Sequence, residues 1–264
     1  MKYLRVLAVF VFLAANIATA KDACLVKGEE LLKKALTIKS KKAVTYGLAA
    51  AVVFKKGCKE GKIECCDKYA QNYLLDFLAS KNIQENLRVL EKGCKKGSAY
   101  SCYTLSSLYS QDTKIKNQVI HKNISKAIEF AKKGCQKGLE ISCNLYNTLA
   151  FLYHKDIKYL KNIEKLCYEK NFFLSCINAA RFYANGINTK RDYDKALKLL
   201  QYACKKKNGR ACFEASLILY KKYEGKKVPK KVEEEVAKLL QNACQNGHKE
   251  SCKILAKSKE GGKK

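Results

Sequence analysis

The stretch that decides the fold is CKKGSAYSC, residues Cys94–Cys102, in which two cysteines stand eight residues apart around a glycine. Eight residues of continuous helix would separate their Cα atoms by about 12 Å, at a rise of about 1.5 Å per residue. A disulfide needs Cα atoms roughly 4.4–6.8 Å apart. Either the two cysteines are not bonded to each other, or the chain reverses direction between them.

The same spacing recurs along the chain. Twelve of the 14 cysteines form six pairs, five separated by eight residues and one by nine, and the first cysteine recurs every 32 to 41 residues. This period is typical of helical solenoids, in which each unit packs only against its neighbours. The pairs are Cys58 with Cys66, Cys94 with Cys102, Cys135 with Cys143, Cys167 with Cys176, Cys204 with Cys212, and Cys244 with Cys252.

Each pair stands between two segments of helical character. Before the first cysteine, apolar residues recur every three or four positions, as in ISKAIEFAKKGC at residues 124–135. After the second cysteine, a segment such as SCYTLSSLY at residues 101–109 usually ends on an aromatic residue. The pattern predicts two helices per unit: first helices beginning near residues 23, 64, 99, 140, 172, 209 and 248, and second helices at roughly 42–57, 83–96, 123–137, 156–170, 191–206 and 230–246.

A glycine three residues after the first cysteine explains how the pairs can close. It occurs in four pairs, where a helix can end in a left-handed cap that glycine accepts without strain. In the other two pairs, Asn171 and Asn208-Gly209 can adopt the same left-handed conformation and end the helix. The chain then reverses, and antiparallel neighbours bring the two sulfurs together. We therefore predict six local disulfides, each worth about 2.5 kcal/mol in the chain-entropy model.

Metal binding is the rival interpretation of the cysteines. The sequence has no Cys-x-x-Cys pair, and its three histidines, His121, His154 and His248, are not spaced with cysteines as a four-ligand zinc site requires. We therefore expect no metal site and no cofactor.

The N-terminus has the layout of a secretory signal peptide. MKYLR precedes an apolar run, and Ala18-Thr19-Ala20 forms a small-residue cleavage site. A membrane anchor is the alternative, but the apolar core of about 13 residues is shorter than the roughly 20 that a spanning helix needs. We expect residues 1–20 to be removed, leaving no transmembrane helix, a solenoid over residues 21–258 and a frayed basic tail at 259–264. The mature protein would be secreted or periplasmic, where disulfides persist.

Two cysteines stand outside the six pairs. Cys24 lies 34 residues before Cys58, where the repeat would place the second cysteine of a pair, and the first cysteine of that pair would have lain in the signal peptide. Cys65 is an extra cysteine beside Cys66. We predict a Cys24–Cys65 bridge that joins the N-terminal helix to the next unit. The alternative is one reduced, buried cysteine and one in a loose chain end.

The repeats resemble the Sel-one-like repeats of the Helicobacter cysteine-rich protein family. The resemblance covers almost all of the mature chain and rests on Cys-x7-Cys, on Lys126-Ala127 and Lys195-Ala196, and on Lys133-Gly134-Cys135. The family's Gly-x-Gly-Val loop survives only partly, at residues 184–187, and one unit is shortened around residues 151–167. The resemblance implies an all-α, TPR-like α/α solenoid of about six two-helix units plus a terminal helix. It also implies an association with penicillin-like compounds and weak β-lactamase activity.

The solenoid architecture and the charge indicate a binding protein. Solenoids bind partners along an extended surface, and the net charge of +29 favours an acidic protein or peptide, an anionic glycan or an anionic lipid surface. The positive charge can instead reflect a lysine-rich face that is only solvated. The tyrosines that end the first helices can likewise serve in packing between helices rather than in binding. We expect no nucleic-acid partner, because export and the absence of a known motif argue against one. The candidate binding residues are Asn72, Tyr73, Tyr109, Arg181, Tyr183 and Tyr220.

The second functional hypothesis is an enzyme. A weak β-lactamase that acts on penicillin-like or peptidoglycan-like molecules follows from the family resemblance alone. Ser-x-x-Lys, Ser-Asp-Asn and Lys-Thr-Gly, the elements of serine β-lactamases, do not occur in the sequence. We therefore assign no catalytic residue, and we predict a secreted, disulfide-rich interaction module that works as a monomer.

Overall fold

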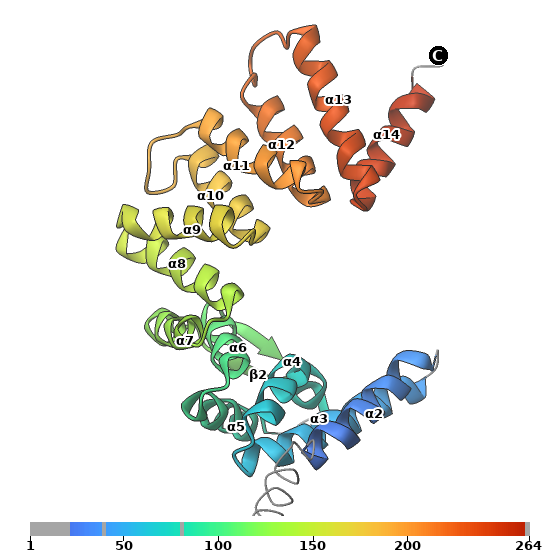
Figure 1. Cartoon of the computed structure of the whole chain (residues 1–264), viewed down its shortest axis with the longest axis vertical. Coiled ribbons are helices and arrows are strands. Elements are labelled where there is room, and N and C mark those ends of the chain that lie inside the picture. Colours follow the sequence, from blue (N-terminus) through green and yellow to red (C-terminus); the bar gives the residue numbers. More distant parts are fainter. Residues whose placement is uncertain (1–21, 39–40, 80–81, 262–264) are drawn as a thin grey trace, which may run out of the picture. The chain divides into compact units, whose positions relative to one another are not determined.

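The computed structural model describes residues 22–38, 41–79 and 82–261 (Figure 1). The predicted signal peptide, residues 1–20, lies outside this part of the chain. Within it, the protein has thirteen helices and one two-stranded sheet, and the prediction of an all-α repeat fold is confirmed. The chain divides into two compact units, Met1–Ser142 and Cys143–Lys264.

The first unit is built from consecutive antiparallel helices. Each helix packs against the next, and α4 also packs against α6, its counterpart in the following repeat. The elements are α2 (Ala23–Thr37), α3 (Lys41–Lys59), α4 (Ile63–Ala79), α5 (Ile83–Lys96), α6 (Ala99–Tyr109), β1 (Thr113–Ile115), β2 (Gln118–Ile120) and α7 (Ile124–Gln136), followed by the first turn of α8 (Glu140–His154).

The second unit repeats this arrangement. From α9 onward each helix packs against its successor, while α10 contacts α12 and α9 contacts α11. After α8 the elements are α9 (Ile157–Glu169), α10 (Phe173–Asn185), α11 (Tyr193–Lys205), α12 (Gly209–Lys221), α13 (Lys230–Gln245) and α14 (Lys249–Gly261). Helix α14 thus includes the first three residues of the tail that we expected to be frayed.

Asparagine and aspartate side chains start the second helix of most repeats. Asn82 Oδ1 accepts a hydrogen bond from the backbone N–H of Gln84, and Asp192 Oδ1 accepts one from that of Lys195. Asn123 and Asp156 cap α7 and α9 in the same way. Such caps satisfy backbone donors that have no partner within the helix, so the helix begins at a defined residue.

The cysteine pairs join the two helices of each hairpin at their shared end. Five of the six predicted local bridges have Cα atoms 4.5–4.8 Å apart, within the range of a disulfide. These five bridges are Cys58 with Cys66, Cys94 with Cys102, Cys167 with Cys176, Cys204 with Cys212, and Cys244 with Cys252. The remaining two cysteines of the series, Cys135 and Cys143, are also disulfide-bonded.

The second cysteine of a pair lies within the first turn of its helix rather than at its first residue. Helix α10 begins at Phe173, three residues before Cys176, and α14 begins at Lys249, three residues before Cys252. Both helices start one residue after the predicted position. Cys176 is fully buried in the core of the second unit, whereas Cys252, near the end of the chain, is partly exposed.

Cys24 and Cys65 form the additional bridge that the sequence predicted. Their Cα atoms lie 6.4 Å apart, and the bond joins α2 to α4. Both cysteines are buried, and none of the cysteines in the described part of the chain is free.

The turns between the paired cysteines use the left-handed conformation that the sequence predicted. Gly97, for example, has φ = 107°, and Asn171 takes the same role with φ = 50°. Between Cys204 and Cys212 the prediction was wrong by one or two residues, because Lys207 adopts the positive φ of 64°. Asn208 instead caps α12, and Gly209 lies so close to α13 that a Cβ would be 2.6 Å from the Asn246 carbonyl oxygen.

Removing one of these local bridges should destabilise its unit measurably. Replacing Cys204 and Cys212 together by alanine is expected to lower the free energy of unfolding by about 2.5 kcal/mol, because the closed ring holds only about nine residues. Urea denaturation followed by far-ultraviolet circular dichroism measures the change. The control is Lys205→Ala, an exposed neighbour expected to change stability by about 0.5 kcal/mol or less. An unchanged unfolding midpoint in the double variant would contradict this role for the bridge.

A short hairpin between α6 and α7 was not predicted. Strand β1 pairs antiparallel with β2, with Thr113 opposite Ile120 and Ile115 opposite Gln118. Ile115 and Ile120 are buried, and Lys116 turns the chain with φ = 54°. Three-residue strands are too short to give a recognisable alternation in sequence, so packing of the two isoleucines decides this structure.

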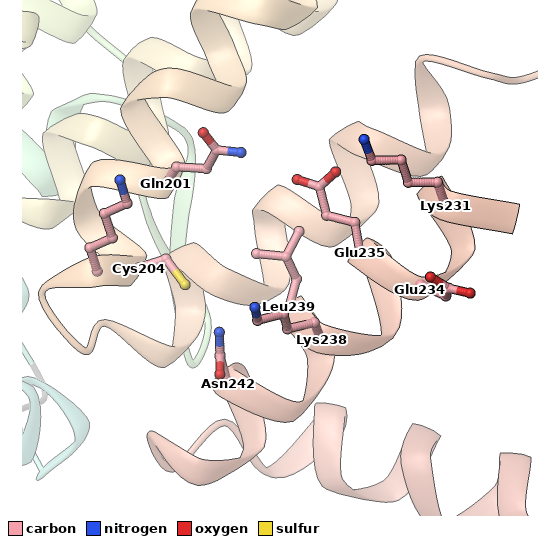
Figure 2. A pocket seen from close by; sticks show the side chains of 9 residues that line it. Gln201, Cys204, Lys231, Glu234, Glu235, Lys238, Leu239 and Asn242 are labelled. Atoms are coloured by element: carbon pink, nitrogen blue, oxygen red, sulfur yellow. The ribbon is translucent and has the colours of Figure 1, made fainter. Parts of the chain in front are cut away.

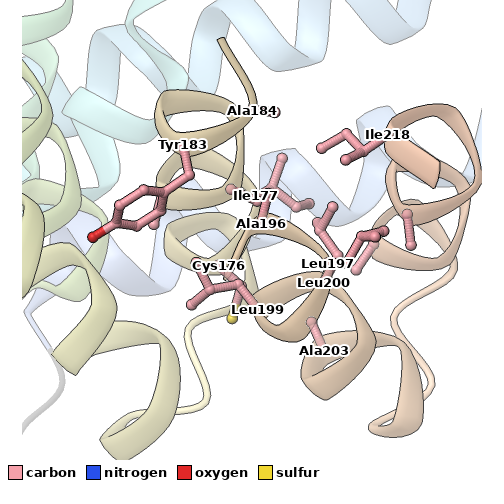
Figure 3. Close-up of a cluster of buried hydrophobic side chains, with 14 of the residues drawn as sticks. Cys176, Ile177, Tyr183, Ala184, Ala196, Leu197, Leu199, Leu200, Ala203 and Ile218 are labelled. Atoms are coloured by element: carbon pink, nitrogen blue, oxygen red, sulfur yellow. The ribbon is translucent and has the colours of Figure 1, made fainter. Parts of the chain in front are cut away.

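A continuous apolar core holds the second unit together (Figure 3). Leu160 and Ile163 of α9, and Leu199 and Leu200 of α11, are almost completely buried. The core extends through α10, α12 and α13, so each helix contributes to more than one repeat interface. Figure 3 also shows the Tyr183 ring directed away from the other labelled side chains, with its hydroxyl at the far end.

The first unit contains a buried polar network among α3, α4 and α5. Lys55 Nζ lies 3.0 Å from Asp76 Oδ2 and donates a hydrogen bond of 2.5 Å to Asn86 Oδ1. The Tyr69 hydroxyl donates to the same Asp76 oxygen at 2.8 Å. Tyr69 is fully buried, and its pKa is raised by burial and by the negative charge of Asp76. Tyr69 therefore remains a protonated hydrogen-bond donor.

The helices differ from membrane spans in length and polarity. In residues 22–38, 41–79 and 82–261, none of the helices combines the length and the apolar character that crossing a bilayer requires.

Candidate binding site

The predicted binding residues divide between the two compact units. Asn72 and Tyr73 lie on α4 and Tyr109 ends α6, all in the first unit. Arg181 and Tyr183 lie on α10 and Tyr220 on α12, in the second unit.

The candidates of the first unit are engaged within the fold. The Asn72 side-chain amide donates to the Lys68 carbonyl oxygen at 2.8 Å, one helical turn earlier. Tyr73 is half-buried, and burial raises its pKa. Tyr109 is 9 % exposed, and its ring stacks on Phe130 of α7 with centroids 6.0 Å apart. These contacts favour the packing role for the tyrosines.

Tyr183 belongs to a three-residue network that joins consecutive helices. Its hydroxyl donates a hydrogen bond to Glu164 Oε1 of α9, and Lys195 Nζ of α11 donates to the Tyr183 oxygen at 2.6 Å. Lys195 Nζ also lies 3.0 Å from Glu164 Oε1 and 4.2 Å from the centre of the Tyr183 ring. The network therefore combines an ion pair with a cation–π contact, both at the edge of the apolar core.

The protonation states of this network do not suit base catalysis. Burial raises the pKa of Tyr183, and the hydrogen bond to Glu164 raises it further. Burial opposes the charge on Lys195, but its hydrogen bonds to Tyr183 and Glu164 outweigh that effect and raise its pKa. A catalytic lysine or tyrosine base needs a pKa lowered toward neutrality. Both groups are therefore protonated at neutral pH.

Tyr220 differs from the other tyrosines because of its register. Tyr73, Tyr109 and Tyr183 stand seven residues after the second cysteine of their repeat, whereas Tyr220 stands eight residues after Cys212. One residue rotates a side chain by about 100° around a helix of 3.6 residues per turn. Leu219 therefore occupies the buried position, and Tyr220 is 60 % exposed. Among the described candidate tyrosines, Tyr220 alone presents most of its ring to solvent.

Arg181 lies beside a groove between α10 and α12. Its guanidinium forms an ion pair with Glu214 of α12, and Arg210 Nε approaches the same carboxylate at 4.0 Å. Lys221 Nζ donates to Asn185 Oδ1 at 3.1 Å across the same two helices. The groove has a volume of about 310 Å³ and is lined by Arg181, Ala184, Asn185, Glu214, Leu217, Ile218 and Lys221.

The α10–α12 groove combines an apolar contact with excess positive charge. Leu217 lines the groove and is 49 % exposed, although it is a leucine. Two arginines face the single carboxylate of Glu214, and Lys221 adds a further cation. The groove can therefore accept an apolar side chain that has acidic neighbours.

A larger pocket of about 620 Å³ lies between α11 and α13 in the second unit (Figure 2). Gln201 and Cys204 stand on one wall, and Glu235 and Leu239 stand on the other. Its charges are mixed, because Glu234 and Glu235 oppose lysines of both helices. No sequence pattern indicated this pocket, since most of its residues are charged or polar side chains at ordinary positions of two helices. The lysines are Lys205, Lys231 and Lys238.

Metal-ligating side chains do not cluster in the structure. Over the described residues, no three His, Cys, Asp or Glu side chains converge as a metal site would require.

Comparisons with known proteins agree with this architecture. The Sel1 repeat matches residues 99–139 and 174–208, one segment in each compact unit. No curated protein matches the chain by sequence.

Two solved structures have a similar fold. One is a protective antigen present in uropathogenic Escherichia coli strains that displays an SLR fold, with a TM-score of 0.55, 19 % identity and 79 % of this chain covered. The other is a Sel1 repeat protein from Oxalobacter formigenes, with a TM-score of 0.55, 17 % identity and 89 % coverage. This chain spans 44 % of the first protein and 87 % of the second. A Sel1 repeat match therefore falls in each compact unit, and the fold of the chain is similar to that of these two solved structures.

Proposed function

We propose that this protein is an exported binding module that holds an acidic segment of a protein partner in the α10–α12 groove. Sel1 repeat proteins serve as protein-interaction modules, and the repeat match supports the same role here. The single observation that carries the choice of surface is Leu217, a half-exposed leucine beside Arg181 and Lys221. Exposed apolar side chains within a charged rim are typical of interaction sites.

The chemistry of the partner follows from the groove. An apolar side chain would replace water over Leu217, and flanking carboxylates would meet Arg181, Arg210 and Lys221. The net charge, +29 for the full sequence and +27 once Lys2 and Arg5 are removed with residues 1–20, would accelerate the encounter with an acidic segment, and added salt would weaken this attraction. Arginine suits such a rim because its planar guanidinium binds carboxylates in a bidentate manner.

Export is the second part of the proposal. With 14 cysteines and none of the described ones free, the fold fits an oxidising, extracytoplasmic compartment. The signal-peptide pattern at residues 1–20 and the Cys-x7-Cys spacing of the Helicobacter cysteine-rich protein family support the same location. Intact mass spectrometry of the exported protein would test this part, and a chain that retains residues 1–20 would contradict it.

The groove is tested with selected peptides. We expect a random peptide library, panned against the immobilised protein, to yield peptides with an apolar residue between acidic residues. Isothermal titration calorimetry then compares the wild type with Leu217→Asp, which places a negative charge inside the groove. We expect Leu217→Asp to weaken binding of the best peptide at least tenfold.

The matched control is Val119→Asp. Val119 is 40 % exposed on β2, in the other compact unit, so the control introduces the same charge at an exposed apolar residue outside the groove. We expect this variant to bind within twofold of the wild type. Equal losses in the two variants, or selected peptides without acidic residues, would overturn the assignment of the groove.

A further inference from the structure

A third cavity in the second unit has a different character from the α10–α12 groove and the α11–α13 pocket. Its volume is about 540 Å³, and it lies between α9, the loop that joins α10 to α11, and the first turn of α11. This size is within the range of small-molecule sites, roughly 300–1,000 Å³. Its lining consists of Ile157, Lys161, Tyr183, Thr189, Lys190, Arg191, Asp192 and Lys195.

The charges that line this cavity are predominantly positive. Four cationic side chains, those of Lys161, Lys190, Arg191 and Lys195, contribute to the lining, against one carboxylate, that of Asp192. Lys195 is already paired with Glu164. Lys161, Lys190 and Arg191 have no carboxylate within ion-pair distance in the described part of the chain. Their charge therefore remains available to a ligand.

The single carboxylate in the lining is already in use. Asp192 Oδ1 accepts the backbone N–H of Lys195 at 2.8 Å and so caps α11. Asp192 therefore acts as the N-cap of α11. In the described part of the chain it forms no ion pair with the neighbouring Lys190 or Arg191.

The loop that carries Lys190 and Arg191 is held at several points. The Asn188 side-chain amide donates to the Phe151 carbonyl oxygen of α8 at 2.9 Å. The backbone N–H of Ile187 donates to the Phe182 carbonyl at 3.0 Å, and that of Asp192 donates to the Tyr183 carbonyl at 2.9 Å. The cations therefore stand on a preorganised loop, which reduces the entropy that binding would cost.

We propose that this cavity binds an anionic phosphate ester or sulfate ester carried on a small molecule or sugar. Three unpaired cations can neutralise the charge, and the Arg191 guanidinium can donate two parallel hydrogen bonds to such a group. The Thr189 hydroxyl and the second Asp192 oxygen can bind hydroxyl groups of a carrier sugar. The cavity lies outside the α10–α12 groove, so the two assignments can fail independently.

The test measures binding of three separate probes: inorganic phosphate, glucose 6-phosphate and a sulfated heparin disaccharide. Isothermal titration calorimetry gives the affinities, and ¹⁵N amide chemical shifts locate the site on the intact protein. We expect saturable binding of at least one probe, with the largest shifts in residues 186–195. Comparing the affinities of the phosphate and sulfate probes distinguishes the two ester types. The difference in affinity between inorganic phosphate and glucose 6-phosphate gives the contribution of the sugar.

The variant pair separates a site from general charge attraction. Lys190→Gln with Arg191→Gln removes two cations of the cavity, and Lys226→Gln with Lys227→Gln removes two exposed lysines from the α12–α13 loop. We expect at least a tenfold loss of affinity in the first variant and less than a twofold loss in the second, with unchanged circular dichroism in both. Equal losses, or no saturable binding of any probe, would overturn the proposal.

Discussion

Replacing Lys55 by methionine is expected to lower the free energy of unfolding of the first unit by about 3–5 kcal/mol. The Lys55 and Asp76 side chains are only 15 % and 9 % exposed, and their charged atoms lie 3.0 Å apart. Methionine fills a similar volume but leaves the Asp76 carboxylate in a poorly solvated site without its cation. Removing one partner of a buried ion pair is costly because the remaining charge has lost its compensation.

The remaining hydrogen bond cannot replace the lysine. Tyr69 would still donate to Asp76, but it brings no positive charge. Asn86 would lose the Lys55 donor to its oxygen, and its side-chain nitrogen is already buried without a hydrogen-bond partner among the described residues. The variant thus leaves two polar groups of the network incompletely satisfied, and each such group costs about 1–3 kcal/mol.

Urea denaturation followed by circular dichroism measures this effect, and Lys59→Met is the matched control. Lys59 lies one helical turn after Lys55 and pairs with Glu85 at 2.5 Å, but both side chains are about half exposed. Exposed pairs contribute roughly 0–1 kcal/mol, so the control should lose no more than that. Adding Asp76→Asn to Lys55→Met should cost less than the sum of the two single changes. Equal destabilisation by Lys55→Met and Lys59→Met would contradict the importance of burial.

The second large effect is expected from Phe151→Ala in the second unit, a loss of about 3–5 kcal/mol. Phe151 is fully buried, and its ring meets that of Phe182 edge to face with centroids 4.9 Å apart. Alanine would leave a cavity between α8 and α10 that the tightly packed core can fill only in part. The variant would also remove the aromatic pair, which contributes beyond its buried area.

Hydrogen exchange read by mass spectrometry locates this effect, and chemical denaturation gives its size. The control is Leu152→Ala, the next residue on the same helix but 37 % exposed, for which we expect a loss below about 1 kcal/mol. We expect the α8 backbone to shift around the cavity in Phe151→Ala, which would weaken the hydrogen bond that Asn188 donates to the carbonyl of residue 151 and speed exchange in the loop that carries Lys190 and Arg191. A loss no larger than in the control would contradict the packing role of Phe151.

Much of the fold could be predicted because its determinants are local. The spacing of Cys94 and Cys102, the Gly97 turn and the Asn82 cap each act within one helical hairpin, and the repeat shows them several times. Helices α5 and α13 begin at the predicted residues for this reason. Lys207 shows the limit of local inference, since a lysine adopts the left-handed conformation at the position where four other cysteine pairs have a glycine.

The candidate site was predicted less well, because exposure depends on neighbours in space. Tyr183 and Tyr220 look alike in sequence, but one residue of register buries the first and exposes the second. Arg181 was a candidate by its position, whereas its pairing with Glu214 joins residues 33 positions apart. Lys190 and Arg191 carried no signal at all, since a basic loop is common in so basic a chain.

The sequence by itself determined the helical repeat, the cysteine pairs and the positive charge, because spacing, capping and turn preferences act over a few residues. Tertiary structure alone decided the Lys55–Asp76 network, the β1–β2 hairpin and the cavities beside Leu217 and Arg191. Each of these depends on side chains from different helices meeting at a particular rotation and distance. Contacts between helices determine which side chains are buried and which form ion pairs, and the periodicity of a single segment does not predict these contacts.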